Sequence, residues 1–170
     1  MKLLIHDLEV EQFNNLFPKL SDDVTVISDN KTIHSCVGCF DCWVKTPGTC
    51  IIKDDYQNMG ELFSRCNELV IISRCYYGGY SPFVKNVLDR SISYILPYFT
   101  IRNKEMHHKS RYLKPIKISS IVYSKDITEK EMNTMESLVA ANAINFNQKD
   151  YKVIFCESPE NTAELWRNMQ

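Results

Sequence analysis

Apolar segments rich in β-branched residues alternate with helical patterns along this 170-residue chain. A continuous apolar run is typical of a parallel strand whose sheet is covered by helices on both faces. Five such runs, the predicted strands, lie at 2–6, 24–28, 69–73, 116–123 and 151–156. Because crossovers between parallel strands are right-handed, this alternation predicts an α/β sandwich of three layers.

Residues that favour helix starts precede several of the helical patterns. Ser81 is a predicted N-cap, and the Pro82 that follows it suits the first helical position. Thr128 and Glu131 have the spacing of a capping box. The predicted helices cover 10–17, 56–65 behind Asp54 and Asp55, 82–95, 132–143, and 159–169 behind Ser158.

The length of the chain is enough for one domain with a real core, and we expect 1–170 to form a single domain. Five strands fit the flavodoxin-like sheet order 2-1-3-4-5, in which ligands bind beyond the carboxyl ends of the strands. The loops after the first, third and fourth strands are therefore candidate binding sites. A cysteine-rich loop at 36–50 and a polar excursion at 100–114 interrupt the pattern.

Positive and negative charges nearly balance in this chain, which has 20 Lys and Arg residues and 21 Asp and Glu residues. The resulting net charge of -1 gives no electrostatic basis for binding nucleic acid. No apolar run approaches the roughly 18 residues that a membrane span needs. His6, Asp7 and Glu9 stand where a signal peptide would be apolar, so we expect a cytoplasmic chain without a membrane partner.

Four of the seven cysteines form a compact C-x2-C-x2-C-x7-C pattern. They are Cys36, Cys39, Cys42 and Cys50. Thiolates at this spacing, with the last returned by a turn at 47–48, predict an iron-sulfur cluster of the 4Fe-4S type. Zinc is less natural because structural zinc sites use two separated pairs, and a redox dithiol leaves Cys50 unexplained. The alternative is reduced thiols that act as small apolar side chains, the role expected of Cys66 and Cys156.

Two segments resemble the NADPH-dependent FMN reductase family, especially its iron-sulfur flavoprotein branch: 36–55, written CVGCFDCWVKTPGTCIIKDD, and 73–90, written SRCYYGGYSPFVKNVLDR. The resemblance implies a flavin-dependent NAD(P)H oxidoreductase with FMN as cofactor. In that family hydride passes from a nicotinamide to the flavin, and the electrons then reach an acceptor, here unknown, or a cluster. No side chain is then needed as an acid or base.

The resemblance also implies which residues contact the flavin. They are Cys75, Tyr76, Tyr77, Gly78, Gly79 and Ser81 after the third strand, with Tyr123 and Ser124 after the fourth. Adjacent glycines permit close backbone approach to a ligand, and tyrosines offer surface for stacking. The alternative is an ordinary turn between a strand and a helix.

The loop after the first strand departs from the family. Family members bind the FMN phosphate there with Ser, Thr and Asn, whereas residues 6–12 contain no hydroxyl group. Asp7, Glu9 and Glu11 instead place carboxylates at the site, which repel a phosphate. FMN then needs another anchor, for instance basic residues in 102–111 of a neighbouring subunit. The alternative is a non-enzymatic flavodoxin-like protein that keeps only a cluster, a metal or reduced thiols.

The chain after the third predicted helix carries more apolar surface than one helix face needs. These side chains are Tyr94, Ile95, Leu96, Tyr98 and Phe99, around Pro97. We expect them to form a homodimer contact. His107 and His108 are adjacent and so point apart on regular structure, which favours a solvated loop over a metal pair. Asp89 and Arg90 are expected to form an ion pair with a neighbouring loop.

Overall fold

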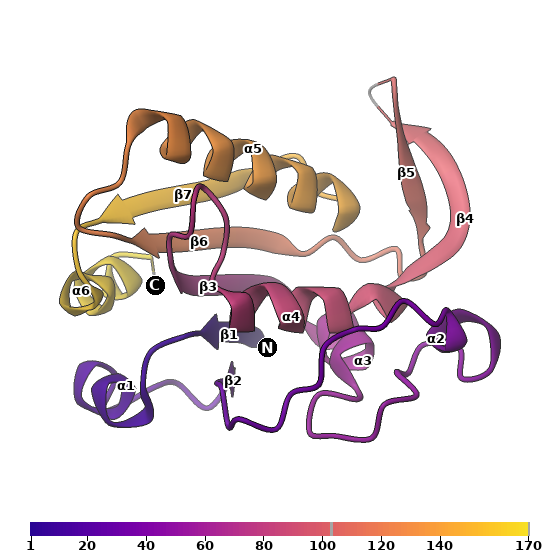
Figure 1. The fold of residues 1–170 in the computed structure, drawn as a ribbon, viewed down its shortest axis with the longest axis horizontal. Coiled ribbons are helices and arrows are strands. Elements are labelled where there is room, and N and C mark those ends of the chain that lie inside the picture. Colours follow the sequence, from indigo (N-terminus) through magenta and orange to yellow (C-terminus); the bar gives the residue numbers. More distant parts are fainter. Residues whose placement is uncertain (103, 170) are drawn as a thin grey trace.

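A computed structural model describes residues 1–102 and 104–169 as a twisted parallel sheet between helices (Figure 1). The five strands of this sheet stand in the order β2-β1-β3-β6-β7. Their bounds are β1 Lys2–His6, β2 Val24–Ile27, β3 Glu68–Arg74, β6 Lys117–Tyr123 and β7 Tyr151–Cys156. Every neighbouring pair is parallel. The predicted flavodoxin-like α/β fold and its strand order are therefore confirmed, with β6 and β7 as the fourth and fifth predicted strands.

Helices cover both faces of the sheet, as the unbroken apolar strands require. The helices are α1 Val10–Leu16, α2 Asp41–Val44, α3 Met59–Arg65, α4 Pro82–Arg90, α5 Glu129–Asn145 and α6 Thr162–Arg167, with short 3-10 turns at Ile92–Tyr94 and Pro159–Asn161. Successive strand residues point to opposite faces, so Leu3 packs in the cluster with α3, α4 and α5. Leu4 packs in the cluster with α1 and α6.

Two of the predicted helix starts are confirmed. The Ser81 hydroxyl accepts a hydrogen bond from the Val84 amide at the start of α4, and Pro82 is the first helical residue. Thr128 and Glu131 form both bonds of the capping box that opens α5. Each motif acts within one turn of helix, which is why the sequence alone reveals it.

Three other helix boundaries differ from the prediction. The last helix, α6, begins at Thr162 after a 3-10 turn, and the Ser158 side chain makes no capping bond. The helix after Ser81 ends at Arg90, because the chain enters a 3-10 turn and then strand β4 at Ile95. The helix expected from residue 56 begins instead at Met59, behind Asn58. Asp54 does not cap it, since its carboxylate binds Arg90. The same carboxylate also accepts the Tyr56 amide at 3.0 Å, so its local bond lies in the loop before α3 and does not cap the helix.

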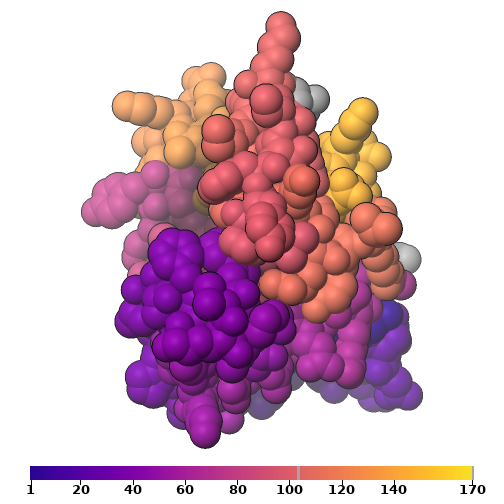
Figure 2. All heavy atoms as spheres, turned by 90° about the vertical axis from the view of Figure 1, so that its right-hand side faces the viewer, coloured from indigo at the N-terminus to yellow at the C-terminus, as the bar shows by residue number. Residues whose placement is uncertain are grey.

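The chain forms an antiparallel hairpin of β4 Ile95–Arg102 and β5 Glu105–Ser110, which begins before the predicted polar excursion at 100–114 and takes up its first part. This hairpin stands apart from the central sheet (Figure 1), and Figure 2 shows it rising above the purple segment that includes the cysteines. His107 and His108, expected in a solvated loop, lie in β5 and are only partly exposed. The His108 ring lies 5.2 Å from that of Trp43, so the hairpin contacts the cysteine-rich loop.

Cys66 is fully buried in the core, whereas Cys156 is partly exposed at the end of β7. Across the two described ranges, no helix has the length and apolar character needed to cross a membrane.

Candidate functional site

The sheet order creates a crevice between the carboxyl ends of β1 and β3. The chain runs from β1 to β2 on one side and then crosses to β3 on the other. Connections leave in opposite directions at this switch point, and open α/β sheets bind ligands there. The loops after β1, β3 and β6 surround it and contain the predicted flavin contacts.

Asp7 follows β1 directly and lies between the ends of β3 and β6. Its carboxylate accepts a 2.8 Å hydrogen bond from the Arg74 amide and a 3.1 Å bond from the Tyr123 hydroxyl. The Ser73 hydroxyl lies 3.4 Å from the same carboxylate. Burial raises the pKa of Asp7, and these hydrogen bonds oppose the shift. The carboxylate therefore takes up polar groups at the switch point that a ligand could otherwise use.

A phosphate monoester does not fit at this loop. The Arg74 amide, a donor at the switch point, is already bound to Asp7. Glu9 is the N-cap of α1, and Glu11 lies in its first turn, so further carboxylates stand where an anion would approach. Free backbone donors and the absence of negative charge are what a phosphate needs at a helix start. In the structure, as in the sequence, the carboxylates of this loop therefore oppose the binding of a phosphate.

The loop after β3 is a tight turn that Gly78 makes feasible. The amide of Tyr76 donates to the Gly79 carbonyl at 2.9 Å, and the Gly79 amide donates back at 2.8 Å. Gly78 has a positive φ of 80°, and a Cβ there would lie 2.7 Å from the Thr134 side chain on α5. This glycine is therefore explained by packing against α5, as in an ordinary turn between strand and helix.

Two tyrosines of the same loop remain available to a ligand. Tyr77 is 91% exposed, and Tyr76 is 42% exposed with the Arg74 guanidinium 5.5 Å from its ring centre. The neighbouring Cys75 amide donates to the Tyr123 carbonyl, which ties this loop to β6. The structure thus brings these predicted contacts together at the carboxyl end of the sheet.

The remaining predicted contacts have structural partners. The Ser81 hydroxyl caps α4, and the Ser81 amide donates to the Ser73 hydroxyl at 2.9 Å. The Ser124 amide donates to the Cys156 carbonyl at 3.0 Å. The Tyr123 hydroxyl is bound to Asp7, and burial, with that carboxylate, raises the pKa of Tyr123.

The four clustered cysteines line one pocket of about 280 Å³ at the other end of α4. Cys36 and Cys39 are exposed, whereas Cys42 and Cys50 are buried. Burial, with the neighbouring thiols, raises the pKa of Cys42. Within residues 1–102 and 104–169, no three His, Cys, Asp or Glu side chains are arranged to hold a metal ion. The thiols share a pocket without forming the ligand set that the spacing predicts.

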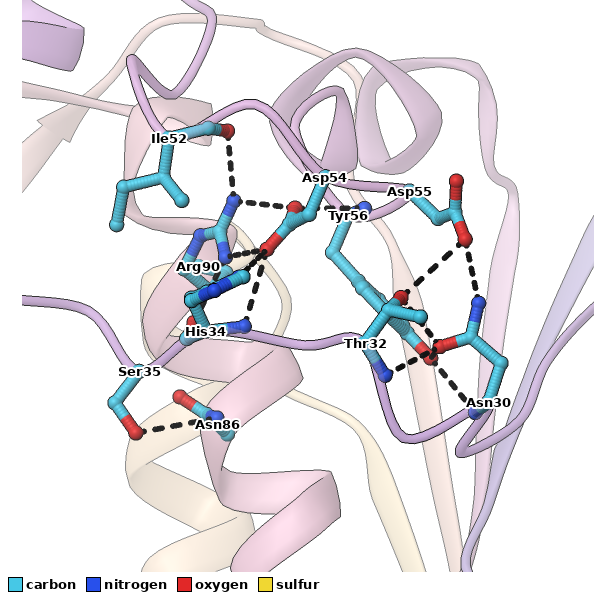
Figure 3. A network of polar contacts seen from close by, with 10 residues as sticks. All are labelled: Asn30, Thr32, His34, Ser35, Ile52, Asp54, Asp55, Tyr56, Asn86 and Arg90. Atoms are coloured by element: carbon cyan, nitrogen blue, oxygen red, sulfur yellow. Dashed lines mark hydrogen bonds and ion pairs between the residues drawn. The ribbon is translucent and has the colours of Figure 1, made fainter.

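Arg90, the last residue of α4, is buried and lines this pocket. Figure 3 shows its polar contacts. Its two terminal nitrogens bind the two Asp54 carboxylate oxygens at 2.6 and 2.8 Å. They also donate to the carbonyls of His34, at 2.8 Å, and Ile52, at 3.2 Å. Although burial alone would raise the pKa of Asp54, the hydrogen bonds from Arg90 hold it well below its usual value. Arg90 therefore forms the predicted ion pair with a neighbouring loop, whereas Asp89, expected to take part in it, pairs with Lys85 within α4.

A second set of contacts, of which Figure 3 shows those among Asn30, Asp55 and Tyr56, holds the chain that leads to the cysteines. The Tyr56 hydroxyl donates to the Ser28 carbonyl at 2.6 Å, and the Asn30 side chain donates to Asp55 at 2.6 Å. The segment after β2 is therefore fixed to the loop before α3. With Arg90, these contacts anchor both ends of the cysteine-rich loop.

Arg90 also brings an unused donor to the pocket wall. Its Nε is buried and has no hydrogen-bond partner among the described residues. Burial alone would lower the pKa of Arg90, but Asp54 and the adjacent Cys50 thiol raise it. The sequence did not reveal this role of Arg90. Only the folded chain brings residues 50–54 back to the end of α4, where Arg90 lies. The only sign of this role in the sequence is a single arginine that follows an apolar helix face.

No family model matches the sequence, and no curated protein matches it. Solved structures share the fold over nearly the whole chain. An FMN-dependent NADH-azoreductase from Bacillus anthracis, in complex with FMN, has a TM-score of 0.55 at 9% identity and covers 96% of this chain and 93% of its own. General stress protein 14 from Treponema denticola, also with FMN, has a TM-score of 0.56 at 16% identity, with 99% and 92% covered.

An NAD(P)H:quinone oxidoreductase from Methanothermobacter marburgensis has a TM-score of 0.58 at 12% identity, with 99% of this chain and 94% of its own covered. At identities this low, these structural matches establish a common fold and nothing more specific.

Proposed function

We propose that this protein is a flavin-dependent NAD(P)H oxidoreductase. The observation that carries the proposal is the match, over at least 96% of the chain, to a solved NADH-azoreductase and an NAD(P)H:quinone oxidoreductase. The exposed Tyr76 and Tyr77 add aromatic surface at the switch point, where this fold places its ligands. The electron donor would be NADH or NADPH, and the acceptor is a further small molecule or protein.

The ring end of a flavin fits this site better than its phosphate end does. The contacts we propose for the ring are Cys75, Tyr76, Tyr77, Gly78, Gly79, Ser81, Tyr123 and Ser124. A bound flavin would supply the hydride chemistry itself. This chain would provide stacking surface and backbone donors around the ring. The Asp7 carboxylate already binds the Arg74 amide and the Tyr123 hydroxyl, so neither donor is free for a phosphate.

A cluster at the cysteine pocket is the second part of the proposal. All four thiols line the pocket, and a cluster bound by four thiolates is anionic, which suits the adjacent Arg90 guanidinium. The thiols would have to converge further than they do here. The exposed Tyr98 and Phe99 on the hairpin support the proposed homodimer. Tyr94 and Ile95, which were expected in the same contact, are instead buried in the core of this chain.

A non-enzymatic role is the competing candidate, and the Asp7 network favours it. A switch point occupied by the protein's own carboxylate needs no cofactor to satisfy its donors. Such a protein would keep the flavodoxin-like fold and use only its cysteines.

Anaerobic purification followed by an absorption spectrum and an NAD(P)H oxidation assay separates the two candidates. The oxidoreductase should show flavin bands near about 375 and 450 nm, as purified or after addition of riboflavin or FMN, and should oxidise NADH or NADPH. A shoulder near about 400 nm would support the cluster. A colourless protein that binds neither flavin and oxidises neither nucleotide contradicts the proposed function.

A further inference from the structure

We infer that Asp7 is a specificity-determining residue that stands in for a ligand phosphate and thereby excludes phosphorylated flavin from the switch point. The ligand class that remains is a flavin without its phosphate, with riboflavin as the simplest member. This inference rests on the proposed function for the identity of the ligand.

The backbone of β1 fixes the position of Asp7. The Asp7 amide donates to the Ile72 carbonyl at 3.3 Å, so this residue continues the ladder between β1 and β3 by one step. Its side chain is thereby held at the crevice, where Arg74 and Tyr123 end the two adjacent strands. An anion bound at this switch point would need the space and the donors that Asp7 uses.

The donors around Asp7 are those that one phosphate oxygen would use. A backbone amide and a tyrosine hydroxyl converge on the carboxylate from β3 and β6 respectively. Both are neutral donors that bind an anion without requiring a particular one. Replacing the carboxylate by a smaller hydroxyl would therefore leave the Arg74 amide and the Tyr123 hydroxyl free for an incoming anion.

Electrostatics act in the same direction. A phosphate at this loop would lie close to Asp7 and near the exposed carboxylates of Glu9 and Glu11. The nearest basic side chain on β3, Arg74, is directed over the Tyr76 ring. Like charges at a few ångströms cost more than the free energy of a ten-fold affinity change when water is partly excluded. Riboflavin carries no such charge and is not penalised.

The test compares the affinities of riboflavin and FMN for the full chain, by quenching of flavin fluorescence. The variants are Asp7→Asn, which keeps the shape and removes the charge, and Asp7→Ser, which also opens space. Asp22→Asn removes an equally negative but exposed side chain at the opposite end of the sheet and is the matched control. Thermal melting of each variant verifies that it is folded.

We expect the wild-type chain and Asp22→Asn to bind riboflavin about ten-fold or more tightly than FMN. In Asp7→Ser the preference should disappear or reverse, and in Asp7→Asn it should weaken. The double variant Glu9→Gln, Glu11→Gln changes only exposed side chains, so it should fold, and it should weaken the preference to a smaller extent.

Equal affinities of the wild-type chain for FMN and riboflavin would overturn the inference while supporting the proposed function. An FMN affinity that appears only in the Asp7 variants, with no riboflavin binding by the wild type, would overturn the assignment of an unphosphorylated flavin and, with it, the proposed function. A preference that is the same in folded wild-type and Asp7 variants, or no binding of either flavin by any of them, overturns the inference.

Discussion

The switch point and the cysteine pocket lie at opposite ends of α4 and differ in how their polar groups are satisfied. At the switch point the Asp7 carboxylate is bound by groups from two neighbouring strands. In the cysteine pocket, Arg90 Nε is buried without a partner among the described residues, beside four free thiols. A buried donor without an acceptor is costly, so the pocket has more to gain from a bound group.

At the switch point the protein's own carboxylate uses two donors that an anion could bind, whereas the cysteine pocket is open. Substitutions and labelling in the two regions should show how much each contributes to the stability of the fold and how accessible its groups are.

Removal of Arg90 should have the largest effect on stability. Arg90→Met leaves the Asp54 carboxylate, with a side chain only 3% exposed, without its cationic partner. Breaking a buried pair in this way costs about 3–5 kcal/mol. Urea unfolding should show this loss, whereas Lys85→Met, which breaks an exposed pair with Asp89, should cost less than about 1 kcal/mol. Equal losses in the two variants would show that the Arg90 network does not anchor the pocket.

His6, at the end of β1, should make the stability of the switch-point side depend on pH. Burial lowers the pKa of His6 to about 4, because its ring is stacked on Phe13 at 3.8 Å between centroids. The unfolded chain then binds the extra proton below pH 6.5, so the free energy of unfolding is highest above that pH and falls towards pH 4. The decrease is at most about 3 kcal/mol.

His6→Phe keeps an aromatic ring against Phe13 and removes the titrating group. Urea unfolding at pH 7 and pH 4.5 should show a smaller difference for this variant than for the wild type. His34→Gln is the control, since its side chain is 70% exposed. An unchanged pH dependence in His6→Phe would exclude His6 as its source.

Gly78 and Gly38 offer a matched comparison of the two loops. Both have a positive φ, but a Cβ on Gly78 would meet Thr134 at 2.7 Å, whereas a Cβ on Gly38 would meet no atom within 4 Å. Gly78→Ala should cost about 2–3 kcal/mol from strain and overlap, and Gly38→Ala about 1 kcal/mol from strain alone. Equal costs, measured by urea unfolding, would show that packing on α5 does not constrain the loop after β3.

The four thiols of the cysteine pocket should differ from one another in their reactivity towards an alkylating reagent. Cys36 and Cys39 are exposed and should react with iodoacetamide before the buried Cys42 and Cys50. Mass spectrometry of partly labelled protein measures the order. Anaerobic treatment with iron and sulfide should protect all four if the proposed cluster forms, and should leave the labelling of Cys156 unchanged. Protection of none would contradict the cluster.

Features that depend on neighbouring residues were predictable from the sequence. The strands follow from apolar runs, and the starts of α4 and α5 follow from Ser81 and Thr128, whose capping partners are three residues away. The acidic character of the loop after β1 is likewise visible in the sequence, and the proposed exclusion of a phosphate there follows from it.

Features that depend on distant partners were not predictable. Asp54 has the sequence environment of a helix cap, but in the structure Arg90, 36 residues away, binds its carboxylate through two bonds. Tyr123 lies 116 residues from Asp7, and only the pairing of β1, β3 and β6 brings them together. The hairpin was missed because its strands pair with each other outside the central sheet.

An amide-detected NMR titration of the full chain with riboflavin tests the central claim most directly, because it reports on both regions at once. The account predicts that the amide signals of Tyr76, Tyr77 and Gly79 shift on addition of riboflavin, whereas those around Arg90 and Cys50 stay in place. Shifts confined to the cysteine pocket, or none at saturating riboflavin, would contradict a flavin site at the switch point.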